Sequence, residues 1–210
     1  MADTALSPRA ALSNIDRAHP AAAVTISERH GLGIATMHVR KGQDSSLRER
    51  IAQHFRVELP NHPALVGAGE VGFLGIGPGA WLALSDNGGH LWCTSLRKIT
   101  APLASISDQS GGYAIFRVGG HAIRDVLAKG FAVDLDARAF KPGDAATTIV
   151  SHVGATIWRC EDIVDGIACF DIVVARSLAH SFWEWFSSSA AEFGCEWQGG
   201  DAIATSPEPA

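Results

Sequence analysis

One stretch in the middle of the chain constrains the fold more than any other. Residues 116–135 read FRVGGHAIRDVLAKGFAVDL, which predicts a strand, a break at Gly119 and Gly120, a short amphipathic helix and a stop at Gly130. A Pro-Gly turn at residues 140–143 and a further strand around Thr147 are expected to follow. Because this stretch pairs no nucleophile with a base, it is typical of a scaffold and not of a catalytic site.

The rest of the chain alternates β-rich segments with segments of helical periodicity. Ser46 and Glu49 have the spacing of a capping box at the start of one of these helices. We expect strands at 24–28, 32–39, 71–76, 81–84, 103–106, 113–118, 147–152, 155–159 and 167–174, and helices at 46–55, 91–99, 122–129 and 178–193.

The order strand–helix–strand–strand–helix occurs twice, once before residue 100 and once after residue 112. This order predicts an α+β fold of duplicated split βαβ-like units, with a mostly antiparallel sheet and helices packed on one face. The domain would span residues 23–198, with pseudo-repeats at about 23–105 and 106–198.

Both ends of the chain differ in composition from this domain. Residues 1–22 are rich in Ala, Ser and Pro and predict an extended arm, whereas residues 199–210 predict a flexible tail. The arm carries isolated apolar side chains that would lie along a partner. Trp183, at the margin of the apolar stripe of the last helix, is a further candidate partner contact, with packing at the edge of the core as the alternative. The candidate interface residues are therefore Leu6, Leu12, Ile15 and Trp183.

Charge and hydropathy exclude two classes of partner. A net charge of -5 without any run of Lys and Arg argues against nucleic acid. No stretch approaches the ~20 apolar residues that a membrane span needs, and the N-terminus lacks the pattern of a secretory signal. The four cysteines, Cys93, Cys160, Cys169 and Cys195, are widely spaced, which indicates buried, unreactive thiols in a reducing cytoplasm and no zinc site.

Two glycine-rich motifs have part of the pattern of a phosphate-binding loop. The motif GIGPG at residues 75–79 leads into the strand pattern of residues 81–84 instead of a helix, so it predicts a hairpin turn. Gly119 and Gly120 do precede a helix, but they lack the Lys-Ser or Lys-Thr and the third glycine of such loops. Close packing of the backbone is the expected use of these two glycines.

The remaining polar residues form no catalytic pattern. Among nine histidines, none pairs with another at i, i+4 on a helix, and His54 is expected in the core or at its boundary. His152 and His180 have no nucleophile with a recognisable motif beside them. Asp134 and Asp136, at alternate positions of an extended segment, would point to opposite sides. We therefore predict no catalytic, cofactor-binding or metal-binding residue in this chain.

The order of several short motifs resembles the gamma subunit of heterotetrameric sarcosine oxidase, a relative of the folate-binding aminomethyltransferase fold. The resemblance covers about residues 65–195. The motifs are LGIGPGAWL at 74–82, the strand–helix junction at 120–127, DL at 134–135, FKPG at 140–143 with Thr147, IW at 157–158, and RS at 176–177 before a Trp-rich helix.

The resemblance implies a noncatalytic structural subunit of a cytoplasmic complex. Such a complex oxidatively demethylates sarcosine to glycine and hydrogen peroxide and passes the one-carbon unit to tetrahydrofolate. FAD, FMN, NAD, tetrahydrofolate and zinc would belong to the partner subunits, which are a large alpha subunit together with beta and delta subunits. This chain would hold none of them.

Two alternatives remain open from the sequence. The chain could be a free-standing folate-binding or aminomethyltransferase-like module, in which case Asp108, at the end of a strand, is the candidate acid for the pterin. It could also be the scaffold of a related complex that oxidises another amine.

Overall fold

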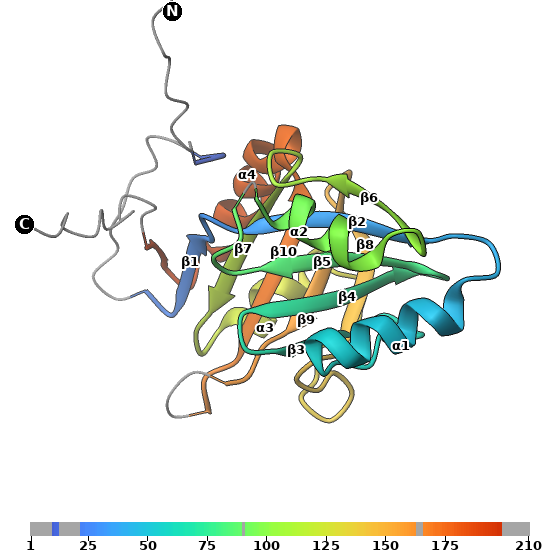
Figure 1. The fold of residues 1–210 in the computed structure, drawn as a ribbon. Helices are drawn as coiled ribbons and strands as arrows, with labels where there is room; N and C mark the ends of the chain where they lie inside the picture. Colours follow the sequence, from blue (N-terminus) through green and yellow to red (C-terminus); the bar gives the residue numbers. More distant parts are fainter. Residues whose placement is uncertain (1–9, 13–21, 90, 163–165, 199–210) are drawn as a thin grey trace, which may run out of the picture.

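The computed structural model describes residues 10–12, 22–89, 91–162 and 166–198 of the chain, and Figure 1 shows their fold. The strands are β1 Val24–Glu28, β2 Gly33–Val39, β3 Leu65–Ala68, β4 Val71–Gly77, β5 Ala80–Ser85, β6 Ala104–Asp108, β7 Tyr113–Gly119, β8 Ala145–Val150, β9 Val153–Arg159, β10 Cys169–Ala175 and β11 Cys195–Trp197. The α-helices are α1 Asp44–Phe55, α2 Leu91–Thr100, α3 Ile123–Ala128 and α4 Ala179–Ala190.

The strands form two sheets. A five-stranded sheet has the order β3-β4-β5-β2-β6, and a six-stranded sheet has the order β11-β1-β7-β10-β9-β8. All pairings within the two sheets are antiparallel except that of β1 with β11, which is parallel. The chain is therefore an α+β protein with mostly antiparallel sheets, as the sequence predicts.

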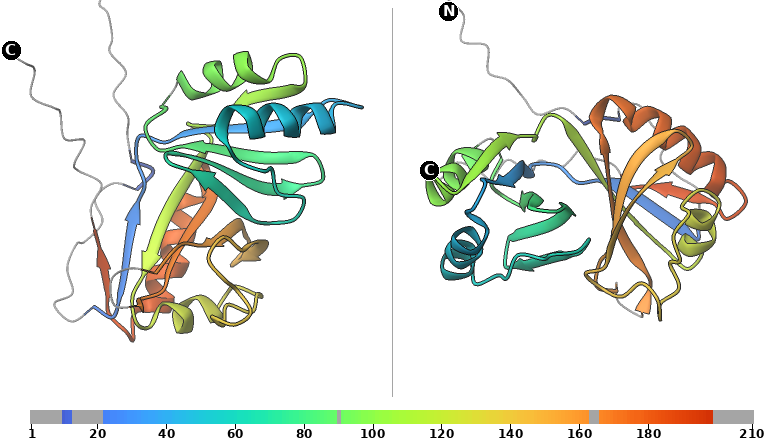
Figure 2. Two further views of the ribbon diagram at one scale, coloured as in Figure 1. Left: turned by 60° about the horizontal axis from the view of Figure 1, so that its bottom comes forward. Right: turned by 90° about the vertical axis from the view of Figure 1, so that its right-hand side faces the viewer.

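The two sheets pack against each other, and each carries its helices on its outer face (Figure 2). Strand residues alternate between the two faces of a sheet, so each sheet contributes side chains to two apolar layers. In β10, for example, Phe170 and Ile172 pack toward α3 and α4, whereas Val173 packs into the layer between the sheets. That middle layer consists of Leu32, Ile34, Leu74, Leu82, Leu84, Ile115, Ala145, Trp158 and Val173.

Most of the predicted helices and strands are confirmed. The differences concern two short strands and the start of α1. Strands β3 and β11, which are four and three residues long, were not predicted. The predicted capping box is wrong: α1 begins at Asp44, its N-cap is Gln43, and Ser46 lies inside the first turn. Arg48 instead stabilises this turn through an ion pair with Asp44 at 2.8 Å.

Strand pairing divides the chain differently from the predicted pseudo-repeats at 23–105 and 106–198. The five-stranded sheet is built from residues 33–108, whereas β1 joins the later strands in the other sheet between β7 and β11. Whether the two halves arose by duplication stays a prediction. In the part of the chain that the structure describes, no helix is long and apolar enough to cross a membrane.

The two glycine motifs have the roles predicted for them. GIGPG at residues 75–79 joins β4 to β5 as a hairpin, with Gly79 at a φ of +66°. Gly120, with a φ of +124°, follows β7, and a Cβ there would lie 2.2 Å from the carbonyl oxygen of Ala23. The backbone preceding β1 therefore passes directly over this glycine.

We expect Gly120→Ala to lower the free energy of unfolding by at least about 2 kcal/mol, because the methyl group would overlap backbone atoms at a positive φ. Gly111→Ala is the matched control, since its Cβ would meet nothing within 4 Å, and it should change stability by less than about 0.5 kcal/mol. Urea denaturation of both variants measures the difference. Equal stabilities would show that the backbone contact at Gly120 is unimportant.

Candidate functional site

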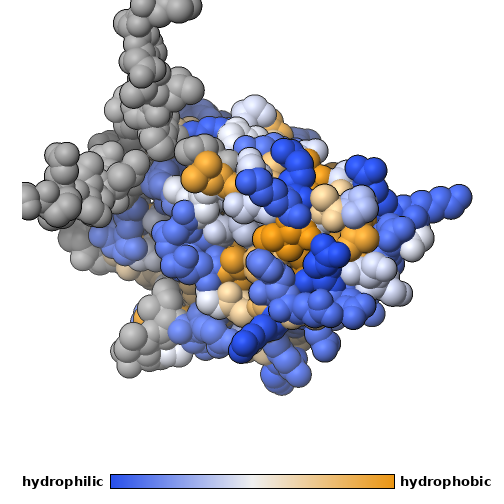
Figure 3. Space-filling model, in the orientation of Figure 1, coloured by the Kyte–Doolittle hydropathy of each residue, from blue (hydrophilic) through white to orange (hydrophobic). Residues whose placement is uncertain are grey.

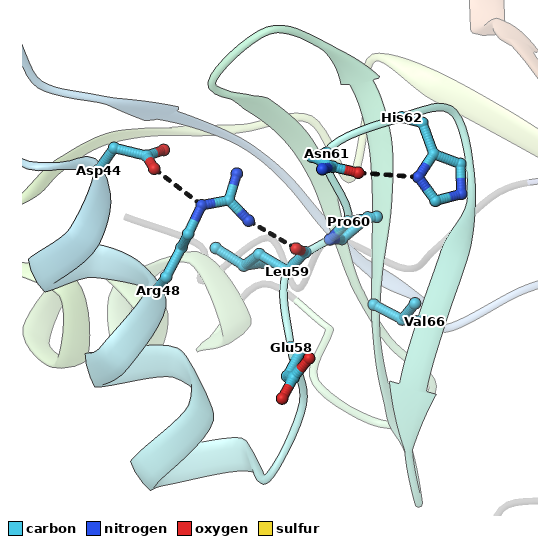
Figure 4. Close-up of a pocket in the computed structure, with 8 residues that line it drawn as sticks. All are labelled: Asp44, Arg48, Glu58, Leu59, Pro60, Asn61, His62 and Val66. Atoms are coloured by element: carbon cyan, nitrogen blue, oxygen red, sulfur yellow. Dashed lines mark hydrogen bonds and ion pairs between the residues drawn. The ribbon is translucent and has the colours of Figure 1, made fainter.

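One hollow on the surface lies between the first turns of α1 and the segment that follows this helix (Figure 4). It has a volume of about 710 Å³. Its lining residues are Asp44, Arg48, Glu58, Leu59, Pro60, Asn61, His62 and Val66.

The polar groups of this hollow are largely engaged with one another. Arg48 pairs with Asp44, donates to the carbonyl oxygen of Leu59 at 2.6 Å and lies over the ring of Trp81. Trp81 in turn donates its indole N–H to the carbonyl oxygen of Pro60 at 2.9 Å. These contacts hold the segment after α1 against the sheet, which is a structural role for Arg48.

A second cleft lies between β3 and β4 of the five-stranded sheet and the strands β7, β9 and β10 of the six-stranded sheet. Its volume is about 430 Å³, and it combines four acidic and three basic side chains with glycines and Trp158. The lining residues are Arg29, Leu65, Gly67, Gly69, Glu70, Val71, Gly72, Leu84, Asp86, Arg117, Pro142, Gly143, Trp158, Arg159, Cys160, Glu161 and Asp171.

Asp171 in β10 is the centre of the charge network in this cleft. Its side chain is 1% exposed, and its carboxylate accepts from Arg29 at 2.8 Å and from Arg117 at 2.8 and 2.9 Å. Arg29 reaches across to Asp86, at the end of β5, with a distance of 2.6 Å. The network therefore links the two sheets through Arg29.

The pairing of Arg117 with Asp171 determines the chemistry that the cleft can offer. The hydrogen bond to Asp171 raises the pKa of Arg117 above its ordinary value, so the guanidinium stays charged. The carboxylate of Asp171 already accepts three charge-assisted hydrogen bonds from the two arginines. This geometry suits a structural ion cluster better than a general base.

Arg159 is a third cation beside this cleft, and its side chain lies on the same face of the sheet as Phe170, opposite to that of Asp171. Its side chain is 4% exposed, it lies over the ring of Phe170, and it pairs with Asp162. It also donates to the carbonyl oxygens of Cys160 and Cys169, while its Nε has no hydrogen-bond partner in the structure. Burial lowers the pKa of Arg159 from its ordinary value.

A separate buried carboxylate, Glu28 in β1, binds the segment at residues 10–12. Its oxygens accept from the backbone amide of Ala11 at 2.8 Å and from that of Leu12 at 3.3 Å. Arg176 lies 3.7 Å from the same carboxylate, and His30 lies 3.9 Å from it. The charge at Glu28 thus satisfies two backbone donors of the arm.

The predicted partner contacts have different outcomes. The prediction for Leu12 needs correction: its side chain is 5% exposed and belongs to the core under α3 and α4, so it is not available to a partner. Leu6 and Ile15 lie outside the described residues. Trp183 is partly buried, and its ring meets the edge of Trp197 at 5.3 Å, which is packing at the edge of the core. A partner contact through its exposed part stays a prediction.

The other residues considered from the sequence do not come together in the structure. The prediction for His54 is wrong, because this side chain is exposed on α1. His152 is exposed in the turn between β8 and β9, and His180 is exposed on α4, 3.6 Å from Glu184. None of these three histidines lines either of the two hollows described above.

Asp134 and Asp136 are used in successive turns and not as an acid–base pair. Asp134 accepts from the amide of Asp136 at 3.0 Å, and Asp136 accepts from the amide of Arg138 at 2.9 Å. The side-chain hydrogen bond from Arg138 lowers the pKa of Asp136. Across the described ranges of the chain, no group of three or more His, Cys, Asp or Glu side chains is arranged to hold a metal ion.

Sequence reasoning missed the Arg29–Asp171–Arg117 network. These residues lie on three strands or strand ends that are far apart in the sequence, and only the pairing of β7 with β10 brings Arg117 opposite Asp171. A charged residue in the middle of the apolar run CFDIVVA at residues 169–175 was the available signal, since a buried carboxylate requires a cationic partner.

Comparison with known proteins yields a family and two related folds. The family described as "Sarcosine oxidase, gamma subunit family" matches residues 40–192. Heterotetrameric sarcosine oxidase from Corynebacterium sp. U-96, in complex with pyrrole 2-carboxylate, contains a chain with a TM-score of 0.72 and 20% identity. The match covers 84% of this chain and 88% of that chain. Among curated proteins, none matches.

The second related fold is the aminomethyltransferase T of the glycine cleavage system from Bartonella henselae. Its TM-score is 0.56 at 10% identity, over 84% of this chain and 48% of that chain. This chain therefore has the fold of about half of the aminomethyltransferase.

We expect Asp171→Asn to lower the free energy of unfolding by about 1–3 kcal/mol, because two guanidinium groups lose their counterion. The side chains of Arg29 and Arg117 are 20% and 46% exposed, so water replaces part of the lost interaction. Asp86→Asn is the control: its side chain is 51% exposed, and its loss should cost less than about 1 kcal/mol. Chemical denaturation compares the two, and equal losses would contradict the central position of Asp171.

Proposed function

Because the chain belongs to the sarcosine oxidase gamma subunit family, we propose that it is a noncatalytic subunit of a heterotetrameric sarcosine oxidase. The family match over residues 40–192 is the observation that carries this proposal. The paired charges of the inter-sheet cleft are consistent with it, since Asp171 and Asp86 together balance Arg29 and Arg117 and the cluster supports the fold.

The proposed complex oxidatively demethylates sarcosine to glycine and hydrogen peroxide and transfers the one-carbon unit to tetrahydrofolate. In this proposal FAD, FMN, NAD, tetrahydrofolate and zinc are bound by the alpha, beta and delta subunits, and the gamma subunit contributes a rigid surface to the large alpha subunit. The complex would work in the cytoplasm, where thiols stay reduced, and all four cysteines of this chain are free thiols.

Exposed apolar side chains support a role in assembly. Leu91, at the start of α2, and Ile149, in β8, are 63% and 68% exposed. Figure 3 shows apolar side chains among polar ones in the middle of the face that carries α1 and α2; Ile149 belongs to the other sheet. Apolar groups left in water at single positions are ordinary, but a patch of them on one face is typical of a surface that binds a partner.

Strand β8 is the candidate contact that the topology favours. It forms one end of the six-stranded sheet, so its outer edge has no neighbouring strand in the described fold. The side chain of Ile149 is the most exposed of the large apolar residues. Such an edge is a site where another chain can add a strand or pack a side chain.

The main test is the purification of a tagged chain from its native cell. We expect the larger, flavin-containing subunits to come with it, and sarcosine-dependent formation of hydrogen peroxide in the eluate. The isolated chain should bind no flavin and convert no sarcosine. Turnover or bound flavin in the isolated chain would disprove the noncatalytic assignment, and the recovery of a lone chain would disprove membership of a complex.

Calorimetry with tetrahydrofolate separates this proposal from that of a free-standing folate-binding module. We expect no binding to the isolated chain. Asp108 is exposed and accepts from the amide of Ser110 at 2.9 Å, so the candidate acid already stabilises the turn after β6. Micromolar binding that is lost in Asp108→Ala would favour the folate-binding module.

The contact through β8 has its own test. Ile149→Lys should lower the affinity for the partner subunits about tenfold, which corresponds to the loss of an interface contact worth about 1.4 kcal/mol. Ser105→Lys adds the same charge to an exposed position of β6, the edge strand of the other sheet, and should leave assembly unchanged. Equal recovery of partners by both variants would place the contact elsewhere.

A further inference from the structure

Two cysteines that are nine positions apart in the sequence lie opposite each other at the end of the β9–β10 pair. The register pairs Arg159 with Phe170, so the next position brings Cys160 opposite Cys169. The amide of Cys160 donates to the carbonyl oxygen of Cys169 at 3.0 Å, which extends the antiparallel pairing beyond the end of β9. The backbone therefore holds these two residues side by side.

Both side chains point to the same face of the sheet. Opposed residues of an antiparallel pair share a face, and the neighbouring pair of Trp158 and Asp171 lies on this face as well. Cys160 lines the cleft between the sheets and is partly buried, whereas Cys169 is 3% exposed. A small solute in the cleft thus reaches the pair from the side of Cys160.

The spacing of the backbone matches that of a disulfide. Residues that face each other across an antiparallel hydrogen-bonded pair have Cα atoms about 5.5 Å apart. Disulfides span Cα separations of roughly 4.4–6.8 Å. The two sulfur atoms can therefore bond without moving one strand relative to the other.

The two cysteines differ in how readily they form a thiolate. A hydrogen bond between the two thiols lowers the pKa of Cys169 and, together with burial, raises the pKa of Cys160. The charges of Arg117 and Arg159 also favour the thiolate of Cys169. Burial and the charge of Asp171 oppose this effect. Cationic neighbours of a thiol are typical of cysteines that react with oxidants.

We propose that Cys160 and Cys169 are a site of reversible oxidation, at which a hydroperoxide converts the two thiols to an intramolecular disulfide. The inference rests on the pairing of β9 with β10 and holds whether or not the chain assembles with partner subunits. It departs from the expectation of unreactive thiols at these two of the four cysteines.

The reaction balances with hydrogen peroxide as the oxidant. A thiolate sulfur of the pair attacks one oxygen of the peroxide, the O–O bond breaks, and hydroxide leaves, so that a sulfenic acid forms. The sulfur of the second cysteine then displaces the hydroxyl group, and its proton leaves with that group as water. In sum, two thiols and one peroxide give one disulfide and two waters, and the sulfurs lose two electrons.

The other two cysteines serve as internal controls. Cys93 lies in α2 and is 4% exposed, because it packs into the core between the helices and the five-stranded sheet. Burial raises the pKa of Cys195 to about 11, so it carries little thiolate at neutral pH. Neither of them lies opposite another cysteine in the strand pairing.

Mass spectrometry of the full chain tests the inference. The reduced chain is treated with hydrogen peroxide, unfolded, and alkylated with iodoacetamide. Trypsin then releases both cysteines in one peptide, residues 160–176, because Arg159 and Arg176 bound it. We expect this peptide to be lighter by two hydrogen atoms and unalkylated, whereas the peptides with Cys93 and Cys195 carry the label. Cleavage before Asp162 should leave two fragments joined until dithiothreitol is added.

Variants make the assignment specific. Cys160→Ser and Cys169→Ser should each abolish the cross-link, and Cys195→Ser should retain it. Alkylation of both cysteines of the wild-type peptide after peroxide treatment would overturn the proposal. Disulfides between two chains, or sulfinic acid at these positions in place of the cross-link, would overturn it as well. The wild-type measurement decides even if a serine variant fails to fold.

Discussion

The fold depends on the apolar layer between the two sheets. Trp158 from the six-stranded sheet is fully buried there among the leucines of β4 and β5. Because this layer buries one face of each sheet, the opposite faces must be covered by helices, and they are: α1 and α2 cover one sheet, and α3 and α4 cover the other. Three apolar layers in a chain of this length leave few interior positions for polar groups.

The charged cluster lies on the two central strands of the six-stranded sheet, β7 and β10, beside this apolar layer. Asp171 stands in a strand that is otherwise apolar, and it is tolerated there because Arg117 lies opposite it and Arg29 approaches from the end of β1. Arg29 also binds Asp86 of the other sheet, so the cluster fixes the relative position of the sheets where apolar contact ends. Such networks add orientation more than net stability, since desolvation offsets much of the charge attraction.

Much of the fold was predictable from the sequence, and the candidate site was not. Strand β5 and helix α2 were predicted, because the local hydropathy pattern and the flanking glycine turns specify them. The three-residue β11 is different, since it is a strand only through pairing with β1. The ion cluster and the cysteine pair also depend on strand register. Asp171 has a cationic partner, and Cys169 a second thiol, only because the neighbouring strand places them opposite. The sequence likewise does not predict that the amide of Leu12 binds the carboxylate of Glu28 and that the side chain of Leu12 is buried.

The place of β1 bears on how the chain is synthesised. This strand is made before the other described strands, yet its neighbours are β7 and β11, and the latter ends at Trp197. The five-stranded sheet, by contrast, is complete once residue 108 has emerged. The nascent chain can therefore close one sheet during translation. Strand β1 can pair with β7 once residue 119 has emerged, but its pairing with β11 needs residues up to 197. Pairing at such separation is slow, because loop closure precedes any gain from contact.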